Sequence, residues 1–456
     1  MMMRLIACFI ICILPLTIQA RDGVGDAIEQ IITKTDPSLN IGIKITNLDK
    51  NKVVFAKNAA RYFIPASTLK FIASVAFLEH FGKDYQFTSR VLKKGSSYYL
   101  DIHDPDFKTE DLAHLVKELA EYSGKKIKGN IYILNREFSV PPAMGDKTCS
   151  DITYCMGAPV TLVHINKNCS RLPVSAKRVG KKISVKPDED FPYHIKNNTK
   201  TIPKGERDRL RVDVKNGQYI ISGTLCMGRG KVEIGGVVSD NNLSNVKYHL
   251  KKQLAKAGIQ LKGKILYKKT LPKGRLVSSV SKSLQDIVAI ALKQSDNFIM
   301  DYLLAELATQ NNQHEWRLAV SSLKKLVHEK LGVNLQNSVI KDVSGLSRSN
   351  LIAINQFDSL LKQIAKQPNF AEIKGFMAIP GEDGTLQERF NGMKKLYAKT
   401  GTLGNVSNII GYFYDKNNEL HSFAIFSNNF YGRRAKYRML QEDIIRLVAG
   451  DNSFLE

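Results

Sequence analysis

The strongest constraint on the fold is that the two ends of this chain share one pattern of elements, whereas the long stretch between them has another. Apolar spacing predicts helices and strands at both ends, which together could build an antiparallel sheet covered by helices. At the N-terminal end we expect helix 24–35, strands 41–47 and 52–56, and a buried helix that opens at 65–68. At the C-terminal end we expect strands 396–401, 407–414 and 422–427 and helix 434–448. An α+β sandwich with five strands, shared between the two ends, accommodates all of them.

From about residue 85 to residue 275 the pattern is different. Short apolar runs alternate with turns, and one helical piece lies at 110–122. Residues 171–215 contain 13 Lys and Arg, 6 Asp and Glu and four prolines, a composition that indicates exposed connecting structure. Helical spacing resumes at 284–293, 297–309, 317–331 and 354–366. We therefore predict one discontinuous domain, 21–84 with 276–456, into which residues 85–275 are inserted as two small β-rich subdomains.

The first twenty residues have the features of an export signal. Arg4 provides a positive charge, residues 5–16 are almost entirely apolar, and Ala20 provides a small residue before the polar Arg21. This arrangement predicts a signal peptide at 1–20 and a mature chain in the periplasm or elsewhere outside the cytoplasm. No later run approaches the roughly 18 apolar residues that a membrane-spanning helix needs, so we expect no stable membrane anchor.

The charge balance favours an anionic partner. The chain contains 67 Lys and Arg against 43 Asp and Glu, a formal net charge of +24. Nucleic acid, anionic lipid head groups and an acidic cell-wall polymer would all be attracted to such a protein. The export signal argues against nucleic acid, and no recognised nucleic-acid-binding motif occurs. We therefore expect no nucleic-acid partner.

Four cysteines remain once the signal is removed, namely Cys149, Cys155, Cys169 and Cys226. An even number in an oxidising compartment predicts two disulfides, and four cysteines allow three pairings. We prefer Cys155 with Cys169, across a short segment, and Cys149 with Cys226, although the residues alone leave all three pairings open. There is no Cys-x-x-Cys and no His-x-x-x-His, so neither a metal nor another cofactor is expected.

Three short motifs could together carry nucleophilic catalysis. Ser67-x-x-Lys70 puts a hydroxyl and an amine on one helix face, and burial would favour a neutral amine that can accept the serine proton. Ser295-Asp296-Asn297 lies between two predicted helices, and Lys399-Thr400-Gly401 ends a predicted strand at a glycine that lets a ligand approach the backbone. Taken singly, they are also explained by a solvated surface pair, a helix N-cap and an ordinary strand end.

The order of the motifs resolves this ambiguity. The chain contains eight Ser-x-x-Lys copies and a second Ser-Asp-Asn at Ser239, whereas Lys-Thr-Gly occurs once. Only Ser67, Ser295 and Lys399 give the three motifs in order, each on the kind of element that the chemistry needs. This set is characteristic of penicillin-binding proteins and serine β-lactamases.

Over essentially the whole mature chain, the sequence resembles the low-molecular-mass penicillin-binding proteins of the D-alanyl-D-alanine carboxypeptidase/endopeptidase type (penicillin-binding protein 4 type, class C, peptidase family S13). Asp342–Arg348 is similar to the family's Asp-Gly-Ser-Gly-Leu-Ser-Arg, and residues 380–386 end in its Asp-Gly-Thr-Leu. The 228 positions between Ser67 and Ser295 match the large insertion of this class. Val343, which replaces a glycine, departs from the family pattern.

The resemblance implies a serine β-lactamase/transpeptidase-like sandwich and a role for each motif residue. Four residues would act on the reacting bond. Ser67 would be the nucleophile and Lys70 the general base. Ser295 would relay a proton, and Lys399 would hold the charge of this hydrogen-bonding network. Five would bind the substrate: Asn297, Thr400, Gly401, Thr402 and Arg348. The arginine would recognise a charged peptide side chain such as diaminopimelate. The backbone N–H groups of Ser67 and Thr402 would form the oxyanion hole, where one donor contributes roughly 3–4 kcal/mol.

The reaction implied by the resemblance is cleavage of the D-Ala–D-Ala bond of peptidoglycan stem peptides through an acyl-enzyme. Water attack gives carboxypeptidase activity, and cleavage of a cross-link gives endopeptidase activity. β-Lactam antibiotics would acylate the same serine and so act as covalent inhibitors. Two alternatives stay open: a serine β-lactamase, which the large insertion argues against, and a catalytically silent wall-binding protein. Whether the chain forms a homodimer is also left open.

Overall fold

A five-stranded antiparallel sheet joins the two ends of the chain. The structure, a computed structural model, describes residues 23–136, 154–187, 191–215, 217–237, 242–311 and 315–451. The strand order of this sheet is β18-β19-β20-β1-β2. Its strands are β1 (Asn40–Asn47), β2 (Lys52–Lys57), β18 (Leu396–Leu403), β19 (Val406–Tyr414) and β20 (Leu420–Asn428). Pairing of β1 with β20, in which Ile43 lies opposite Ile425, confirms the predicted sheet built from both ends.

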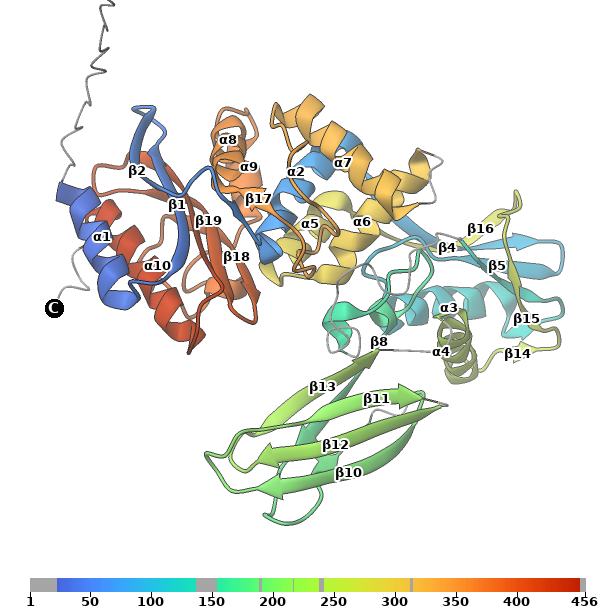
Figure 1. Ribbon diagram of the computed structural model, residues 1–456. Helices are drawn as coiled ribbons and strands as arrows, with labels where there is room; N and C mark the ends of the chain where they lie inside the picture. The colour runs from blue at the N-terminus through green and yellow to red at the C-terminus, as the bar shows by residue number, and fades with distance from the viewer. Residues whose placement is uncertain are drawn as a thin grey trace, which may run out of the picture.

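Helices cover both faces of this sheet (Figure 1). α1 (Gly23–Thr35) and α10 (Arg434–Ala449) pack together on one face, and α8 (Ile354–Ala365) packs on the other. Strand β20 shows the alternation directly, because Phe423 and Ile425 belong to the core beneath α1 and α10, whereas Ala424 and Phe426 belong to the core beneath α8. The sheet is therefore the middle layer of a sandwich.

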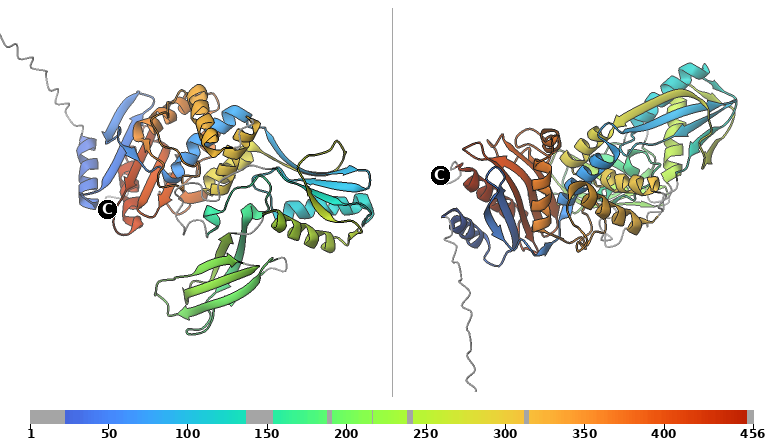
Figure 2. Two further views of the ribbon diagram at one scale, coloured as in Figure 1. Left: turned by 45° about the vertical axis from the view of Figure 1, so that its right-hand side comes forward. Right: turned by 90° about the horizontal axis from the view of Figure 1, so that it is seen from above.

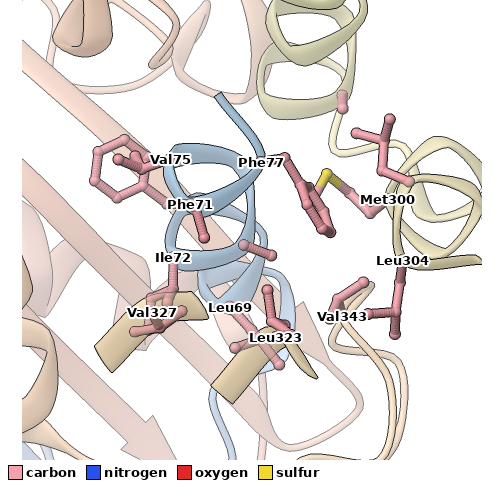
Figure 3. Close-up of a cluster of buried hydrophobic side chains, with 14 of the residues drawn as sticks. Leu69, Phe71, Ile72, Val75, Phe77, Met300, Leu304, Leu323, Val327 and Val343 are labelled. Carbon is pink, nitrogen blue, oxygen red and sulfur yellow. The ribbon is translucent and has the colours of Figure 1, made fainter. Parts of the chain in front are cut away.

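A second group of helices stands beside the sheet and surrounds α2 (Leu69–Phe81). Every residue of α2 from 69 to 78 is buried, and all of them except Lys70 and Ser74 are apolar, so the helix is covered on every side. Figure 3 shows Phe77 of α2 facing Met300, and Leu323 and Val343 lining the same core. The surrounding helices are α5 (Leu284–Lys293), α6 (Asn297–Gln310) and α7 (Trp316–Leu331).

The start of α2 differs from the prediction. A single 3₁₀ turn, Ala66–Thr68, precedes the α-helix, which begins only at Leu69. Ala66 has a φ of 49°, in the left-handed region, so the right-handed α-helix cannot extend back to include it. Ser67 therefore lies on a tight turn at the helix entrance.

The middle of the chain forms further sheets away from the α2 core (Figures 1 and 2). A five-stranded sheet, β15-β7-β5-β4-β16, shares its core with α3 (Thr109–Ser123) and α4 (Asn242–Lys256). Its strands are β4 (Gln86–Lys94), β5 (Ser97–Asp101), β7 (Ile131–Leu134), β15 (Ile265–Lys268) and β16 (Arg275–Ser283). In this middle part, the short strands β6 (Lys126–Ile127) and β14 (Gln260–Leu261) also pair. Outside it, β3 (Tyr62–Phe63) pairs with β17 (Ile352–Ala353), and α9 (Phe370–Gly375) is a short helix.

Two three-stranded sheets, β10-β12-β11 and β13-β8-β9, share another core. Their strands are β8 (Cys169–Ser175), β9 (Ser184–Val185), β10 (His194–Ile202), β11 (Arg211–Lys215), β12 (Gln218–Cys226) and β13 (Lys231–Val237). The expectation that residues 171–215 are connecting structure is therefore wrong. In β11 the buried Val212 and Val214 alternate with the polar Arg211, Asp213 and Lys215, so the high content of charged residues reflects the other face of the strand.

The preferred disulfide, Cys155–Cys169, is present, with its Cα atoms 5.3 Å apart. Cys149 lies outside the described residues, so its pairing with Cys226 stays a prediction; Cys226 is buried at the end of β12. The second Ser-Asp-Asn, at Ser239, also lies outside the described residues. Within the described ranges, no helix is both long and apolar enough to cross a bilayer.

Candidate active site

The segment that leads to Ser67 is clamped by two strands from the C-terminal end of the chain. Asn428 Oδ1 in β20 accepts a hydrogen bond from the backbone N–H of Ile64 at 2.7 Å. Asn408 in β19 donates from Nδ2 to the carbonyl of Ile64 at 2.8 Å and to that of Pro65 at 3.0 Å. Asn428 also donates to Asn408 at 3.1 Å, so the two buried amides fix each other as well as the segment.

Ser67 and Lys70 meet at hydrogen-bonding distance, as their i, i+3 spacing predicts. Ser67 is half-buried, whereas Lys70, in the first turn of α2, has no exposed surface. Lys70 Nζ donates to Ser67 Oγ at 2.8 Å and to Asn297 Oδ1 at 2.7 Å. It also donates to the backbone carbonyl of Ser344. These three acceptors are neutral oxygens, which together hold the amine in place beside the hydroxyl.

The loop 342–348 supplies the Ser344 carbonyl and is fixed by two buried aspartates. Asp301, one turn into α6, accepts the backbone N–H of Ser344 at 3.0 Å. Asp342 accepts the backbone N–H of Gly345 at 2.8 Å. Gly345 has a φ of 76°, and an added Cβ there would lie 1.9 Å from a backbone oxygen of the nucleophile turn. Only glycine fits this close approach.

Ser295 and Lys399 form a second hydroxyl–amine pair. Ser295 precedes α6 with a left-handed φ of 57°, and Asp296 caps the helix by accepting the N–H of Ile299 at 3.0 Å. Lys399 Nζ donates to Ser295 Oγ at 2.9 Å. Lys399 has no exposed surface, and this burial, together with the nearby charge of Lys70, holds the pKa of Lys399 well below its usual range. An amine with a lowered pKa gives up its proton more readily.

Strand β18 brings the Lys-Thr-Gly motif alongside the nucleophile turn. A Cβ at Gly401 would lie 2.7 Å from the carbonyl oxygen of Pro65, so glycine is what allows the strand to approach. Thr400 Oγ1 is buried and lies 2.8 Å from Thr385 Oγ1, to which it donates a hydrogen bond. Thr402, two positions further along β18, is half-buried.

Arg348 lies at the edge of this arrangement. Its side chain is exposed, and a guanidinium nitrogen would lie 2.9 Å from a Cβ added at Gly404. Gly404 belongs to the turn between β18 and β19, so the arginine stands beside the strand that carries the Lys-Thr-Gly motif. An exposed cation at this position can meet an anionic group on a bound ligand.

The segment closed by the Cys155–Cys169 disulfide contacts the Ser-Asp-Asn motif at two points. Lys167 Nζ donates to the carboxylate of Asp296 at 2.6 Å. The backbone carbonyl of Met156 accepts a hydrogen bond from Asn297 Nδ2 at 2.9 Å. Asn297 is therefore held at both ends of its amide, by this segment on one side and by the α2 lysine on the other.

Several residues that position the site were missed by sequence reasoning. Thr385 lies in the Asp-Gly-Thr-Leu segment and could have been found from that resemblance. Ser344 contributes a backbone carbonyl, which no side-chain pattern marks, and Lys167 has nothing in the sequence to set it apart from the other basic residues. Val343, which departs from the family pattern, is fully buried against the α2 core shown in Figure 3.

The site thus pairs two hydroxyls with two buried amines at the meeting point of α2, α6 and β18. Such a set provides a nucleophile, a base beside it and a second proton carrier, which are the groups that acyl transfer requires. Within the part of the chain that the structure describes, no three His, Cys, Asp or Glu side chains cluster in a way that could hold a metal ion.

Known families and proteins agree with this chemistry. The model of the D-Ala-D-Ala carboxypeptidase 3 (S13) family matches residues 24–448. The D-alanyl-D-alanine carboxypeptidase DacB of Haemophilus influenzae is 26% identical over 425 residues, which cover 88% of each chain. The D-alanyl-D-alanine carboxypeptidase of Actinomadura sp. (strain R39) is 23% identical over 430 residues, which cover 87% of this chain and 80% of that relative.

Solved structures give the same result for the fold. The crystal structure of penicillin-binding protein 4 from Haemophilus influenzae has a TM-score of 0.79 at 25% identity, covering 92% of this chain and 99% of its own. The same protein complexed with a β-lactam has a TM-score of 0.73. These similarities confirm the predicted fold class and the resemblance drawn from the motifs. The chain belongs to the D-Ala-D-Ala carboxypeptidase 3 (S13) family.

Proposed function

We propose that Ser67 carries the D-Ala-D-Ala carboxypeptidase reaction of this family by forming an acyl-enzyme with peptidoglycan stem peptides. The observation that supports this assignment best is the 2.8 Å hydrogen bond between the fully buried Lys70 Nζ and the half-buried Ser67 Oγ. A nucleophile within reach of solvent, with an amine fixed behind it, is what acyl transfer needs.

In acylation, Ser67 Oγ attacks the carbonyl carbon of the penultimate D-alanine while Lys70, as a neutral amine, accepts the hydroxyl proton. The negative charge on the carbonyl oxygen would be stabilised by the backbone N–H groups of Ser67 and Thr402. The C–N bond then breaks, and the terminal D-alanine leaves as an amine after it receives a proton from Ser295. Lys399 donates to Ser295 and has a lowered pKa, so it can replace that proton.

In deacylation, the proton that Lys70 took from Ser67 first passes to the Ser295–Lys399 pair, which gave one to the leaving amine, so Lys70 is neutral again. Water then attacks the ester carbon and gives a proton to Lys70, which passes it to Ser67 Oγ as the ester bond breaks. The shortened peptide is released and the hydroxyl of Ser67 is restored. We assign substrate binding to the amide of Asn297, to the carboxylate-binding edge of β18, and to Arg348 for a charged side chain. That edge consists of Lys399, Thr400, Gly401 and Thr402. Cleavage of a cross-linked peptide would use the same groups, so we propose endopeptidase activity as well.

Peptidoglycan lies outside the cytoplasm, and so does an enzyme that acts on it. We propose that the signal at 1–20, which lies outside the described residues, delivers the chain to the periplasm. The division into a catalytic domain, 21–84 with 276–456, and an inserted region, 85–275, also remains our proposal, as does the absence of a stable membrane anchor. Monomer and homodimer both remain compatible with the proposal.

Intact-mass spectrometry with benzylpenicillin tests the assignment. We expect one penicilloyl adduct on the wild type and none on Ser67→Ala. Ser359→Ala is the matched control, because Ser359 is exposed and begins another Ser-x-x-Lys copy, on α8. It should label like the wild type. An adduct that persists in Ser67→Ala would remove Ser67 from the mechanism, and rapid turnover of free penicillin would indicate a β-lactamase instead.

A further inference from the structure

One stretch, which begins near the end of the inserted region and continues ten residues beyond it, contains no acidic residue. Residues 241–285 contain eleven Lys and Arg and no Asp or Glu. At the chain's overall ratio of 43 acidic to 67 basic residues, eleven basic residues would be accompanied by about seven acidic ones. A generally basic composition therefore does not account for this stretch, which forms α4, β14, β15 and β16.

A groove with basic rims runs between α4 and the β14–β15 segment. Its volume is about 560 Å³. The rims carry Lys247 and Lys251 from α4 and Lys264 from the turn before β15, and the floor includes Leu254, Ile259 and Ile265. We call these six residues the basic groove. An apolar floor between cationic rims suits an elongated ligand that presents apolar faces and negative charges together.

The rim lysines are not neutralised by the protein itself. Among the described residues, none of Lys247, Lys251 and Lys264 forms an ion pair with a carboxylate. Lys251 and Lys264 are exposed, and Lys247 Nζ lies 5.5 Å from the ring centroid of Tyr267, which is 40% exposed. Three cations and an exposed tyrosine are thus available to a ligand at one place.

The basic groove lies far from the catalytic residues. Figure 1 shows α4, β14 and β15 at one end of the molecule, with the helices around α2 between them and β18. Figure 2 shows the same separation from two other directions. A ligand that fills the groove therefore does not compete with a peptide in the active site, and a long polymer could occupy both at once.

We propose that the basic groove is a second binding site for peptidoglycan, which it holds through the carboxylates of stem peptides and the apolar faces of sugar rings. This inference rests on the proposed function, because it takes the polymer that is cleaved as the ligand. Charge complementarity supports an anionic polymer, and concavity favours a strand over a membrane, since a flat bilayer cannot enter a groove. Binding here would keep the enzyme on the wall between successive cleavages.

Co-sedimentation with purified, insoluble peptidoglycan sacculi tests this site. All proteins carry Ser67→Ala, so that retention reports binding and not turnover. We expect the triple variant Lys247→Glu/Lys251→Glu/Lys264→Glu to bind sacculi about tenfold more weakly than its parent, and added salt to weaken the parent's binding. The control, Lys330→Glu/Lys366→Glu/Lys394→Glu, changes the net charge equally at exposed lysines elsewhere and should be retained like the parent.

Three outcomes decide for or against the basic groove, and a fourth bears on the proposed function. Selective loss in the groove variant supports the proposal, provided that the same triple variant with Ser67 intact still releases D-alanine from a soluble pentapeptide at the wild-type rate. Equal loss of sacculus binding in the groove and control variants would show that only net charge matters, and it would overturn the proposal. Binding to vesicles of anionic phospholipid but not to sacculi would also overturn it. Failure to cleave the soluble pentapeptide at all would count against the proposed function and not against the groove.

Discussion

At the scale of single residues, Lys399 connects catalysis with the pH dependence of stability. Its pKa in the folded chain lies well below the ordinary 10.5, so between those two values the unfolded chain binds one proton more than the folded chain. The contribution of Lys399 to stability therefore increases as the pH rises through this window. We expect Lys399→Met to gain less stability than the wild type between pH 7 and pH 9.5, as measured by urea unfolding.

The same substitution removes the proton carrier beside Ser295. We expect acylation by a labelled penicillin to slow by at least about 100-fold, the range for loss of a proton-transfer group. Lys394→Met, at an exposed lysine outside the site, should change neither property. If Lys399→Met acylated at the wild-type rate, Lys399 would have no part in proton transfer.

The sequence predicted those site residues that belong to a recognised motif or lie a short, regular distance apart along the chain. Ser67 lies on the 3₁₀ turn that leads directly into α2 and Lys70 follows three positions later, so their contact is the one that i, i+3 spacing predicts. Their meeting with Asn297, 227 positions away from Lys70, could be anticipated only through the family's motif order. The carbonyl of Ser344 could not, because its place depends on how Asp301 fixes a loop in the tertiary structure.

At the scale of elements, the disulfide-closed segment 155–169 touches the Ser-Asp-Asn motif through Lys167 and Met156. Lys167 lies between Asp296, at 2.6 Å, and Asp106, at 2.8 Å, and Asp106 is almost fully buried. Removing the cation would leave Asp296 without its outer partner and loosen the start of α6. We therefore expect Lys167→Met to slow penicillin acylation by about tenfold, measured as a second-order rate constant.

Lys167→Arg is the informative companion, because it keeps the positive charge between the two aspartates and should restore most of the rate. A comparable fall in both variants would show that packing and not charge matters here. If Lys167→Met lowered the unfolding temperature but left the acylation rate unchanged, the lysine would stabilise the fold without positioning the motif.

The same segment carries a histidine that makes stability depend on acid pH. His164 is fully buried beside the ring of Phe298, and burial lowers its pKa from 6.5 to about 3. Between these values only the unfolded chain binds the proton, so stability falls as the pH drops below 6.5. We expect the stability difference between wild type and His164→Gln to shift by about 3 kcal/mol in favour of the variant between pH 6.5 and pH 4. Urea unfolding of both proteins, with the exposed His114→Gln as control, measures this shift.

At the scale of the whole molecule, hydrophobic periodicity predicted the sandwich but not every part of the inserted region. The strands of the central sheet are long and strongly apolar, so their pattern was clear even though β1 and β20 lie at opposite ends of the chain. In 171–215, the 13 Lys and Arg and the four prolines together outnumber the apolar residues, so the alternation along each strand is hard to recognise. That alternation becomes evident only when the strands pair and bury Val212 and Val214 against Tyr219.

The asparagine clamp on the nucleophile segment has a consequence for the life of the newly made protein. Ribosomes build the chain from its N-terminus. The hydrogen bonds that fix Ile64 can form only after Asn408 and Asn428 have been made, 344 and 364 positions later. A partly translated or half-exported chain holds Ser67 and Lys70 but neither the clamp nor Lys399. The hydrolase therefore stays inert until almost its entire length has been synthesised and has reached the outside of the cytoplasm, where its substrate lies.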